Sequence, residues 1–192
     1  MSKKILIIYA HSNPKSFTGT ILDTAVETLK AKNHEVVIRD LYAMKFNPVM
    51  TITDLDQFTG AKPPADVEEE QKHIKWCDII FFIYPLWWSG APAIAKGYID
   101  RVFTYGFSYS IIDGKIEGLL NKGVVVFSPQ GAPKETSEKE VWPAIEVVTK
   151  NYFFDVSALK CLGHFRFPSI LVVSQEVRQE YLAEVKKFCS EL

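Results

Sequence analysis

The sequence predicts an α/β domain in which a five-stranded parallel sheet is covered by helices on both faces, a three-layer sandwich. Two observations predict this class. Apolar runs of strand length alternate along the chain with segments whose apolar residues recur at helical spacing. The 192 residues suit one full-sized core and would be cramped as two domains, so residues 1–192 are expected to form a single domain.

The first strand and helix are the clearest elements. Residues 4–10 form an unbroken apolar run, which is typical of a strand covered on both faces. Residues 18–32 carry apolar side chains at helical spacing, and Asn33-His34 turns the chain into a second strand at 35–40. The following stretch, 41–65, is punctuated by proline and glycine and is expected to be a loop.

The alternation continues through the rest of the chain. Residues 66–76 predict a short acidic helix with Asp66 as its N-cap, and residues 78–84 predict a third buried strand. A helix over 92–103 begins with a proline, whose missing N–H costs little at the first helical position. The remaining elements are expected in the order strand 124–127, helix 137–151, strand 157–165 and helix 175–189.

Five parallel strands in a chain of this size are expected in the order 2-1-3-4-5, counted along the chain. In such a sheet a ligand lies outside the carboxyl ends of the strands, where the strand order reverses beside strand 1. The loops after strands 1, 3 and 4 are therefore the expected place for chemistry, and these three loops have unusual sequences.

The first loop, residues 11–19, ends at a helix N-terminus, where free N–H groups and the helix dipole favour an anion. Ser16 and Thr18 add hydroxyl donors, and His11 can donate from its ring. An ordinary Ser/Thr cap with a proline-containing turn explains the same residues without a ligand. Both interpretations remain open from the residues alone.

The second loop, residues 84–92, contains the adjacent pair Trp87-Trp88. Two neighbouring indoles in an extended loop cannot both point inward, so at least one is expected to face solvent, a ligand or a partner subunit. A planar, electron-poor ring would be a favourable neighbour, and Gly90 permits close backbone approach. In the alternative, both indoles wrap around the following helix.

The third loop, residues 128–133, is rich in small and turn-forming residues. Its main-chain N–H groups could reach the edge of a flat ligand and stabilise negative charge there. Taken alone, it predicts no more than a Pro/Gly loop. The functional interpretation depends on the convergence of all three loops on one crevice.

Composition and charge exclude other classes of protein. The net charge is −1 with scattered Lys and Arg, which argues against a nucleic-acid binder. No apolar run reaches the roughly 18 residues of a membrane span, and the N-terminus is interpreted as a strand rather than a signal peptide. The three cysteines form no C-x-x-C pair, as expected in a reducing cytoplasm.

Metal chemistry is not predicted either. His34, His73 and His164 show no metal-ligand spacing, so no metal site is expected. The run Glu68-Glu69-Glu70 is interpreted as a solvated helix face rather than a group of catalytic carboxylates.

Several motifs together resemble a known family. They are Ala10-His11-Ser12 with Ser16-Phe17, Asp40 to Met44 with Phe46-Asn47-Pro48, Pro85-Leu86 through Asp100 to Phe103, and Gly106 to Tyr109. On these residues the chain resembles the NAD(P)H:quinone oxidoreductases of the flavodoxin-like superfamily, the DT-diaphorase type and its shorter bacterial relatives. The resemblance runs from residue 4 to about 127 and returns in the final helix.

The resemblance implies a cytoplasmic, homodimeric flavoprotein that passes a hydride from NAD(P)H to FAD or FMN, with a lean to FAD, and then to a quinone, an azo or a nitro compound. His11, Ser16, Phe17 and Thr18 would surround the phosphate and ribityl chain of the flavin. The ring would be flanked by Pro85, Leu86, Trp87 and Trp88, and held at its other edge by Gln130 and Gly131. Tyr109 would line the substrate pocket, typically from the neighbouring subunit.

Two departures from the family pattern stand out. The third loop of the family usually reads Thr-Thr-Gly-Gly, whereas this chain has Pro129-Gln130-Gly131-Ala132. The places of a tyrosine and a histidine proposed to relay charge are held approximately by Ser137 and Pro143, so no relay can be assigned. Two alternatives stay open: a flavodoxin-like electron carrier, for which a net charge of −1 is a poor match, and a flavin- or nucleotide-sensing subunit associated peripherally with a membrane transporter.

Overall fold

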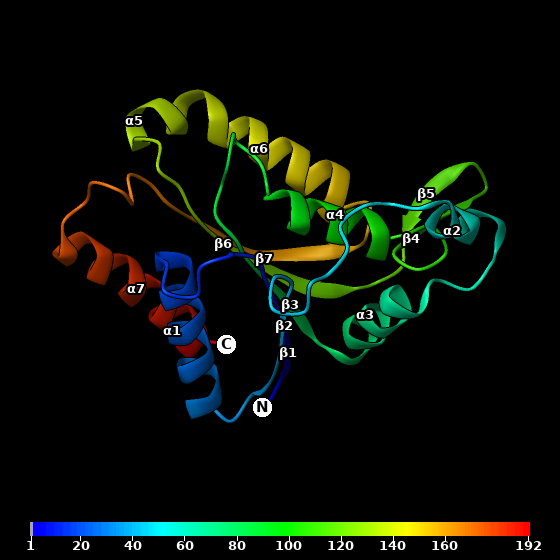
Figure 1. Ribbon diagram of the computed structural model, residues 1–192, viewed down its shortest axis with the longest axis horizontal. Helices are drawn as coiled ribbons and strands as arrows, with labels where there is room; N and C mark the ends of the chain where they lie inside the picture. Colours follow the sequence, from blue (N-terminus) through cyan, green and yellow to red (C-terminus); the bar gives the residue numbers. More distant parts are fainter. Residues whose placement is uncertain (1) are drawn as a thin grey trace.

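The structure is a computed structural model that describes residues 2–192 (Figure 1). Its central sheet has five parallel strands in the order β2-β1-β3-β6-β7, which is the predicted order 2-1-3-4-5 once the main-sheet strands are counted along the chain. The strands are β1 (Lys4–Tyr9), β2 (Glu35–Asp40), β3 (Ile79–Ile83), β6 (Lys122–Pro129) and β7 (Leu159–Phe167).

Helices cover both faces of this sheet. The helices α1 (Phe17–Ala31) and α7 (Gln175–Ser190) lie on one face, and the other face carries α3 (Ala65–Trp76), α4 (Ala93–Val102) and α6 (Trp142–Thr149). Strand periodicity explains why two cores form. In β1, Leu6 and Ile8 join the α3/α4/α6 core, while Ile5 and Ile7 join the α1/α7 core, because successive side chains point to opposite faces.

The predicted helix 137–151 exists despite Pro143, as part of a longer helical run. Proline lies in the first turn of α6, where its missing N–H is tolerated. Two wide π-helical turns, η2 (Ser137–Val141) and η3 (Lys150–Phe154), flank α6. A short α5 (Lys134–Thr136) precedes them.

The N-cap of α3 is Pro64 rather than the predicted Asp66, which lies in the first turn of the helix. Two further parts of the structure differ from the predicted elements. An antiparallel hairpin, β4 (Tyr109–Ile112) and β5 (Lys115–Gly118), follows α4. Its turn is Asp113-Gly114, with φ of +51° and +75°, a two-residue combination that favours tight hairpins. The segment 41–65 is also not wholly a loop. It contains α2 (Ile52–Leu55) and the 3₁₀ turn η1 (Asp56–Thr59).

The connection between β2 and α3 packs against α4 and is bonded to it. Arg101 donates from Nε to Asp54 Oδ1 over 3.0 Å and from Nη1 to Asp66 Oδ2 over 2.7 Å. One turn earlier on α4, a Cβ at Gly97 would lie 2.2 Å from the carbonyl oxygen of Pro48, so only glycine allows this approach. Side chain and backbone thus hold the connection in place.

Glu70 corrects the expectation of a wholly solvated acidic helix face. It is 1% exposed, its carboxylate pairs with Arg39, and it accepts a hydrogen bond from the Tyr98 hydroxyl. Glu69 stays largely in solvent, as predicted. Within residues 2–192, no helix is both long and apolar enough to cross a bilayer.

Candidate functional site

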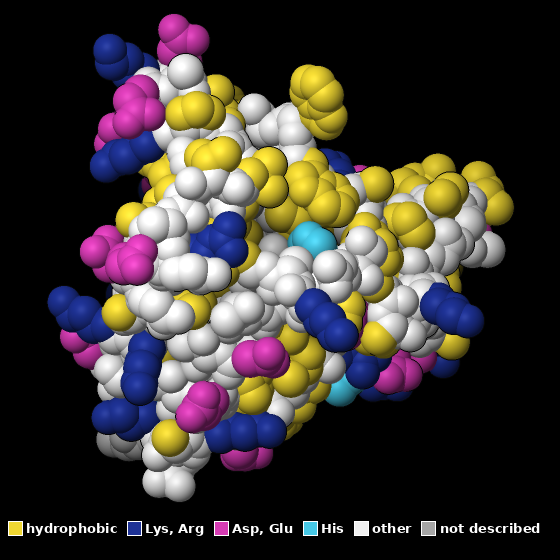
Figure 2. Space-filling view, turned by 60° about the vertical axis from the view of Figure 1, so that its left-hand side comes forward, with side chains coloured by type: hydrophobic (Ala, Val, Ile, Leu, Met, Phe, Trp, Pro, Cys, Tyr) yellow, Lys and Arg dark blue, Asp and Glu magenta, His cyan; other side chains and the backbone are white. Residues whose placement is uncertain are grey.

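The loops after β1, β3 and β6 meet at the carboxyl edge of the sheet, as predicted. The Ala10 N–H donates to the Ile83 carbonyl over 3.0 Å, which joins the starts of the first and second loops. The Leu86 N–H donates to the Pro129 carbonyl over 2.9 Å and joins the second loop to the third. Apolar side chains gather around a hollow on the side of the molecule where the three loops lie (Figure 2).

The first loop presents free donors at the start of α1. Ser16 is the N-cap, and its Oγ accepts from the Gly19 N–H over 3.2 Å. The N–H groups of Phe17 and Thr18 have no hydrogen-bond partner among the described residues. Beneath them the hydroxyl of Tyr9 is buried, at 1% exposure of the residue, and also lacks a partner in that part of the chain.

The shape of this loop is fixed by its own residues. A Cβ on Gly19 would lie 2.0 Å from the Pro14 carbonyl oxygen, so only glycine lets the loop pack on the helix. Asn13 donates its N–H to His11 Nδ1 over 3.0 Å, and burial lowers the pKa of His11. The imidazole is therefore neutral near pH 7, with its proton on Nε2 and available for donation.

The second loop turns both indoles outward. Trp87 is 45% exposed and Trp88 is fully exposed, which confirms that at least one faces away from the core. Trp87 and Gly90 exchange two backbone hydrogen bonds of 3.0 and 3.1 Å around a turn in which Trp88 and Ser89 have φ of +50° and +60°. Such left-handed backbone in non-glycine residues stores strain and is a common feature of functional loops.

The same loop lies against its neighbours. The Trp87 ring meets the His11 ring edge-on, with centroids 5.8 Å apart, so the first and second loops are in contact through side chains. Pro85 and Leu86 are buried below the indoles. The backbone at Gly90 borders open space, since an added Cβ would meet only the Trp87 carbonyl oxygen at 3.9 Å.

Gln130 in the third loop points into the protein. Its Nε2 donates to Ser137 Oγ over 2.8 Å, and its Oε1 accepts from Trp142 Nε1 over 3.0 Å. Its backbone N–H and carbonyl are bonded to Phe167 and Ile170. Gln130 thus anchors the loop to α6 and β7, and the N–H groups of Gly131 and Ala132 have no partner among the described residues and are available to a ligand.

A polar cluster behind α6 was not predicted. Arg166 on β7 pairs with Glu146 at 2.5 Å, contacts His164 Nδ1 at 3.1 Å, and lies over the Trp142 ring at 5.7 Å. Burial, and then the Arg166 charge, lower the pKa of His164 to about 4. The signal in the sequence is the i, i+2 spacing of His164 and Arg166, which places both on one face of an edge strand.

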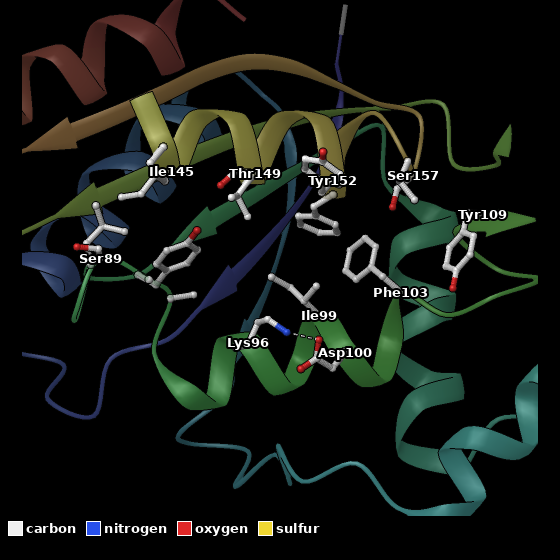
Figure 3. A pocket seen from close by; sticks show the side chains of 18 of the residues that line it. Ser89, Lys96, Ile99, Asp100, Phe103, Tyr109, Ile145, Thr149, Tyr152 and Ser157 are labelled. Carbon is white, nitrogen blue, oxygen red and sulfur yellow. Dashed lines mark hydrogen bonds and ion pairs between the residues drawn. The ribbon is translucent and has the colours of Figure 1, made fainter. Parts of the chain in front are cut away.

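A groove of about 900 Å³ runs between α4 and α6 and opens beside the second loop (Figure 3). Ser89 lies at one end of it and Tyr109 at the other. Within one chain, therefore, the structure brings the residues of the three loops together but leaves Tyr109 away from them. The assignment of Tyr109 to the substrate pocket of a neighbouring subunit stays a prediction.

The site fits a flavin on the observations of this chain. The partnerless Tyr9 hydroxyl and the free amides of Phe17 and Thr18 match an anionic phosphate. The exposed indoles and the open backbone at Gly90 suit a flat ring. Among residues 2–192, no group of three or more His, Cys, Asp or Glu is placed to hold a metal ion.

Comparison with known proteins gives relatives over most of the chain. An uncharacterized NAD(P)H oxidoreductase of Haemophilus influenzae is 40% identical over 129 residues, 66% of this chain and 64% of that protein. Human ribosyldihydronicotinamide dehydrogenase (quinone) is 34% identical over 143 residues, 66% of this chain and 62% of that protein. The chain thus spans less than two thirds of the length of these two relatives.

Solved structures match more completely. An NAD(P)H:quinone oxidoreductase from Methanothermobacter marburgensis aligns with a TM-score of 0.90 and 27% identity over 99% of this chain and 98% of that one. The Smu.1420 protein of Streptococcus mutans aligns with a TM-score of 0.83 and 32% identity over 98% and 100%. A family described as having a flavodoxin-like fold matches residues 3–189. The chain belongs to this flavodoxin-like family.

Proposed function

We propose that the chain binds a flavin and uses NAD(P)H to reduce quinones by two electrons. The overall reaction is NAD(P)H + H⁺ + quinone → NAD(P)⁺ + hydroquinone. The observation that carries the proposal is the convergence of three loops at the switch point of the sheet, each with free donors or exposed aromatic surface. The names of the aligned relatives support the same reaction.

The first loop would hold the phosphate of the flavin. The N–H groups of Phe17 and Thr18 and the dipole of α1 favour a negative charge there. Ser16 accepts from Gly19, and its hydroxyl would donate its own proton to the phosphate. The Tyr9 hydroxyl adds a donor from below, which would also give this buried group a partner.

The second and third loops would hold the ring. Leu86 would give an apolar floor, Trp87 and Trp88 flat walls, and the Gly131 N–H a donor for the remaining edge. When bound, the flavin supplies the group that takes up a hydride and gives it away. The protein's part is to hold donor and acceptor in contact and to exclude water, since hydride transfer needs no acid or base residue.

Two finer assignments belong to this proposal. Of FAD and FMN we favour FAD, because the resemblance to DT-diaphorase-type enzymes is strongest in the N-terminal half. We also propose a homodimer, because large apolar side chains of the hairpin, α6 and η3 are exposed, namely Ile111, Ile112, Ile116, Val148 and Tyr152. A partner hairpin would bring its Tyr109 toward the three loops. Release of the flavin by heat, followed by chromatography, identifies the cofactor.

The decisive experiment measures NADH and NADPH oxidation by purified, flavin-loaded protein with menadione as acceptor. We expect menadione-dependent turnover, and Trp88→Ala to lower kcat/KM at least about tenfold without changing the free energy of unfolding, because Trp88 is fully exposed. The matched control Ile38→Ala changes an exposed apolar residue on β2. A flavin-loaded protein that oxidises neither nucleotide would refute the proposal.

A further inference from the structure

We propose that Leu171 shields the Gly131 N–H group from water when a flavin is bound, and that the site thereby favours reduced flavin over oxidised flavin. This inference rests on the proposed function, in which the Gly131 N–H is a donor for one edge of the ring. It assigns a role to the β7–α7 loop (residues 168–174), which lies outside the three loops and outside the proposed dimer surface.

The β7–α7 loop is held directly on the third loop. The Ser169 N–H donates to the Ala132 carbonyl over 3.0 Å. The Ile170 N–H donates to the Gln130 carbonyl over the same distance. Arg178, at the start of α7, donates from Nη2 to the Ile170 carbonyl over 2.9 Å. Ser169 has a φ of +56°, a left-handed conformation that persists only where the surrounding structure holds it. These contacts fix the path of the β7–α7 loop relative to the third loop.

The loop places Leu171 beside Gly131. Its Cδ1 and Cγ atoms lie 3.2 and 3.7 Å from the position that a Cβ on Gly131 would take, so Leu171 packs next to the backbone of this glycine. No atom of the adjacent Val172 lies within 4 Å of that position. Leu171 is nevertheless 79% exposed, so most of its apolar surface is available to cover a ligand at the third loop.

The strength of the Gly131 N–H as a donor depends on such a cover. Gly131 is exposed, and its N–H has no partner among the described residues, so water can reach it. A hydrogen bond in contact with water contributes little, because water competes for the donor, and the bond strengthens in apolar surroundings. An apolar side chain next to this donor therefore makes it a stronger partner for a ligand atom.

The gain differs between the two redox states of a bound flavin. Reduction places negative charge on the ring, and hydrogen bonds to charged acceptors are roughly twice as strong as those to neutral ones. Excluding water from the Gly131 N–H therefore stabilises the reduced state more than the oxidised state. Each tenfold preference for the reduced state raises the midpoint potential of the bound flavin by about 30 mV. Leu171 acts through the Gly131 N–H and is thus a positioning residue.

A second copy of the chain is the competing partner for Leu171. The exposed apolar side chains of the proposed dimer surface belong to the β4–β5 hairpin, α6 and η3. The hairpin and the β7–α7 loop lie at opposite ends of the molecule (Figure 1). The flavin is the favoured partner, because Leu171 contacts the residue whose free N–H is the donor for the ring edge.

The test measures dissociation constants for oxidised and dithionite-reduced FAD and FMN without oxygen, together with the midpoint potential of the flavin-loaded protein. These measurements require neither NAD(P)H nor a quinone. Leu171→Ala removes the cover, and Leu171→Met is the conservative variant that keeps it. The matched control is Val172→Ala, at an adjacent apolar residue that is 83% exposed and is not packed against Gly131. Because both positions are exposed, the urea unfolding midpoint should stay at its wild-type value.

We expect Leu171→Ala to weaken binding of reduced flavin by about tenfold and binding of oxidised flavin by less than about twofold. The resulting loss of about fivefold in preference lowers the midpoint potential by about 20 mV. Leu171→Met should keep both quantities near their wild-type values, and Val172→Ala should change neither. A merely structural role of Leu171 would leave the ratio of the two dissociation constants unchanged.

The outcomes separate this inference from the proposed function. Equal weakening of both redox states in Leu171→Ala, or no change in either, overturns the shielding role and leaves the proposed function intact. Loss of a dimer in Leu171→Ala on size-exclusion chromatography assigns the side chain to a second copy and also overturns the shielding role. Selective loss of reduced-flavin binding, in a protein that oxidises neither nucleotide, supports the shielding role and refutes the proposed reaction. A wild-type chain that binds neither flavin overturns both.

Discussion

Replacing Gln130 by leucine tests whether the third loop is held by the side chain that points away from the ligand. The substitution keeps the approximate size of the residue and removes its bonds to Ser137 and Trp142, of 2.8 and 3.0 Å, and a longer one of 3.3 Å to the Ala132 carbonyl. The backbone bonds of residue 130 to β7 and to Ile170 stay available. The loop then keeps its path but loses its attachment to η2 and α6.

The magnitude follows from the two shorter bonds and the groups they leave behind. Each hydrogen bond contributes about 1 kcal/mol net, and a buried donor or acceptor left without a partner costs a further 1–3 kcal/mol or so. Ser137 is 2% exposed, so it has little access to water. We expect a loss of about 2–4 kcal/mol in the free energy of unfolding. At 192 residues this lowers Tm by roughly 5–15 °C.

The assay combines urea unfolding with flavin titration. We expect the flavin dissociation constant to rise at least about tenfold, because the Gly131 N–H loses its fixed place. Trp142→Phe, combined with Gln130→Leu in a double-mutant cycle, should show a coupling of about 1 kcal/mol. Gln179→Leu, at an exposed glutamine of α7, is the control and should stay within about 0.5 kcal/mol. A Gln130→Leu protein with wild-type stability and flavin affinity would show that this reasoning is wrong.

Two further substitutions test the first loop and the cluster behind α6. Gly19→Ala places a Cβ 2.0 Å from the Pro14 carbonyl oxygen. We expect the free energy of unfolding, measured in urea, to fall by roughly 1–3 kcal/mol, although alanine gains about 1 kcal/mol in helix propensity. Flavin binding, measured by titration, should also weaken. His164 has a pKa of about 4 when folded and 6.5 as its ordinary value, so below pH 6.5 the unfolded chain takes up the proton first. The free energy of unfolding should therefore fall by roughly 3 kcal/mol between pH 6.5 and 4, and His164→Gln should remove that fall in urea titrations.

A specific result would contradict each of these two predictions. Thr24→Ala, at a half-buried position further along α1 and away from the first loop, is the control for Gly19→Ala and should leave flavin binding unchanged. Equal flavin affinity in Gly19→Ala and Thr24→Ala would contradict the steric argument. For His164, a stability difference between variant and wild type that is constant from pH 7 to pH 4 would contradict the assigned cause.

The layers of the fold were predictable from sequence because each depends on a local pattern. The apolar run of β1 and the helical spacing of α1 are readable residue by residue, and the order of the strands follows from the alternation. The hairpin was missed although Asp113-Gly114 is a strong turn signal, because its strands are short and largely exposed. The helix α2 was missed because its Thr51 and Asp54 cap a single turn within a proline-rich segment.

The place of the site was predictable, whereas the direction of its side chains was not. His11, Trp87 and Gln130 follow the carboxyl ends of parallel strands, and they therefore lie together at one edge of the sheet. Nothing in the local sequence indicates that Gln130 turns inward, since its partners Ser137 and Trp142 are placed by the packing of α6 on β7. The partners of Glu70 are likewise long-range, with Arg39 31 residues away.

The attachment of the connection between β2 and α3 to α4 also bears on the order of folding. Arg101 and Asp54 are separated by 47 residues in sequence, and β3 is formed between them. A contact of such long range closes a large loop, which is slow unless the intervening strand and helix have already brought the ends together. The connection is therefore expected to dock late, after β3 and α4 are in place. Once docked, α4 cannot leave the sheet without breaking this attachment, so the wall of the groove and the connection behind it open as one cooperative unit.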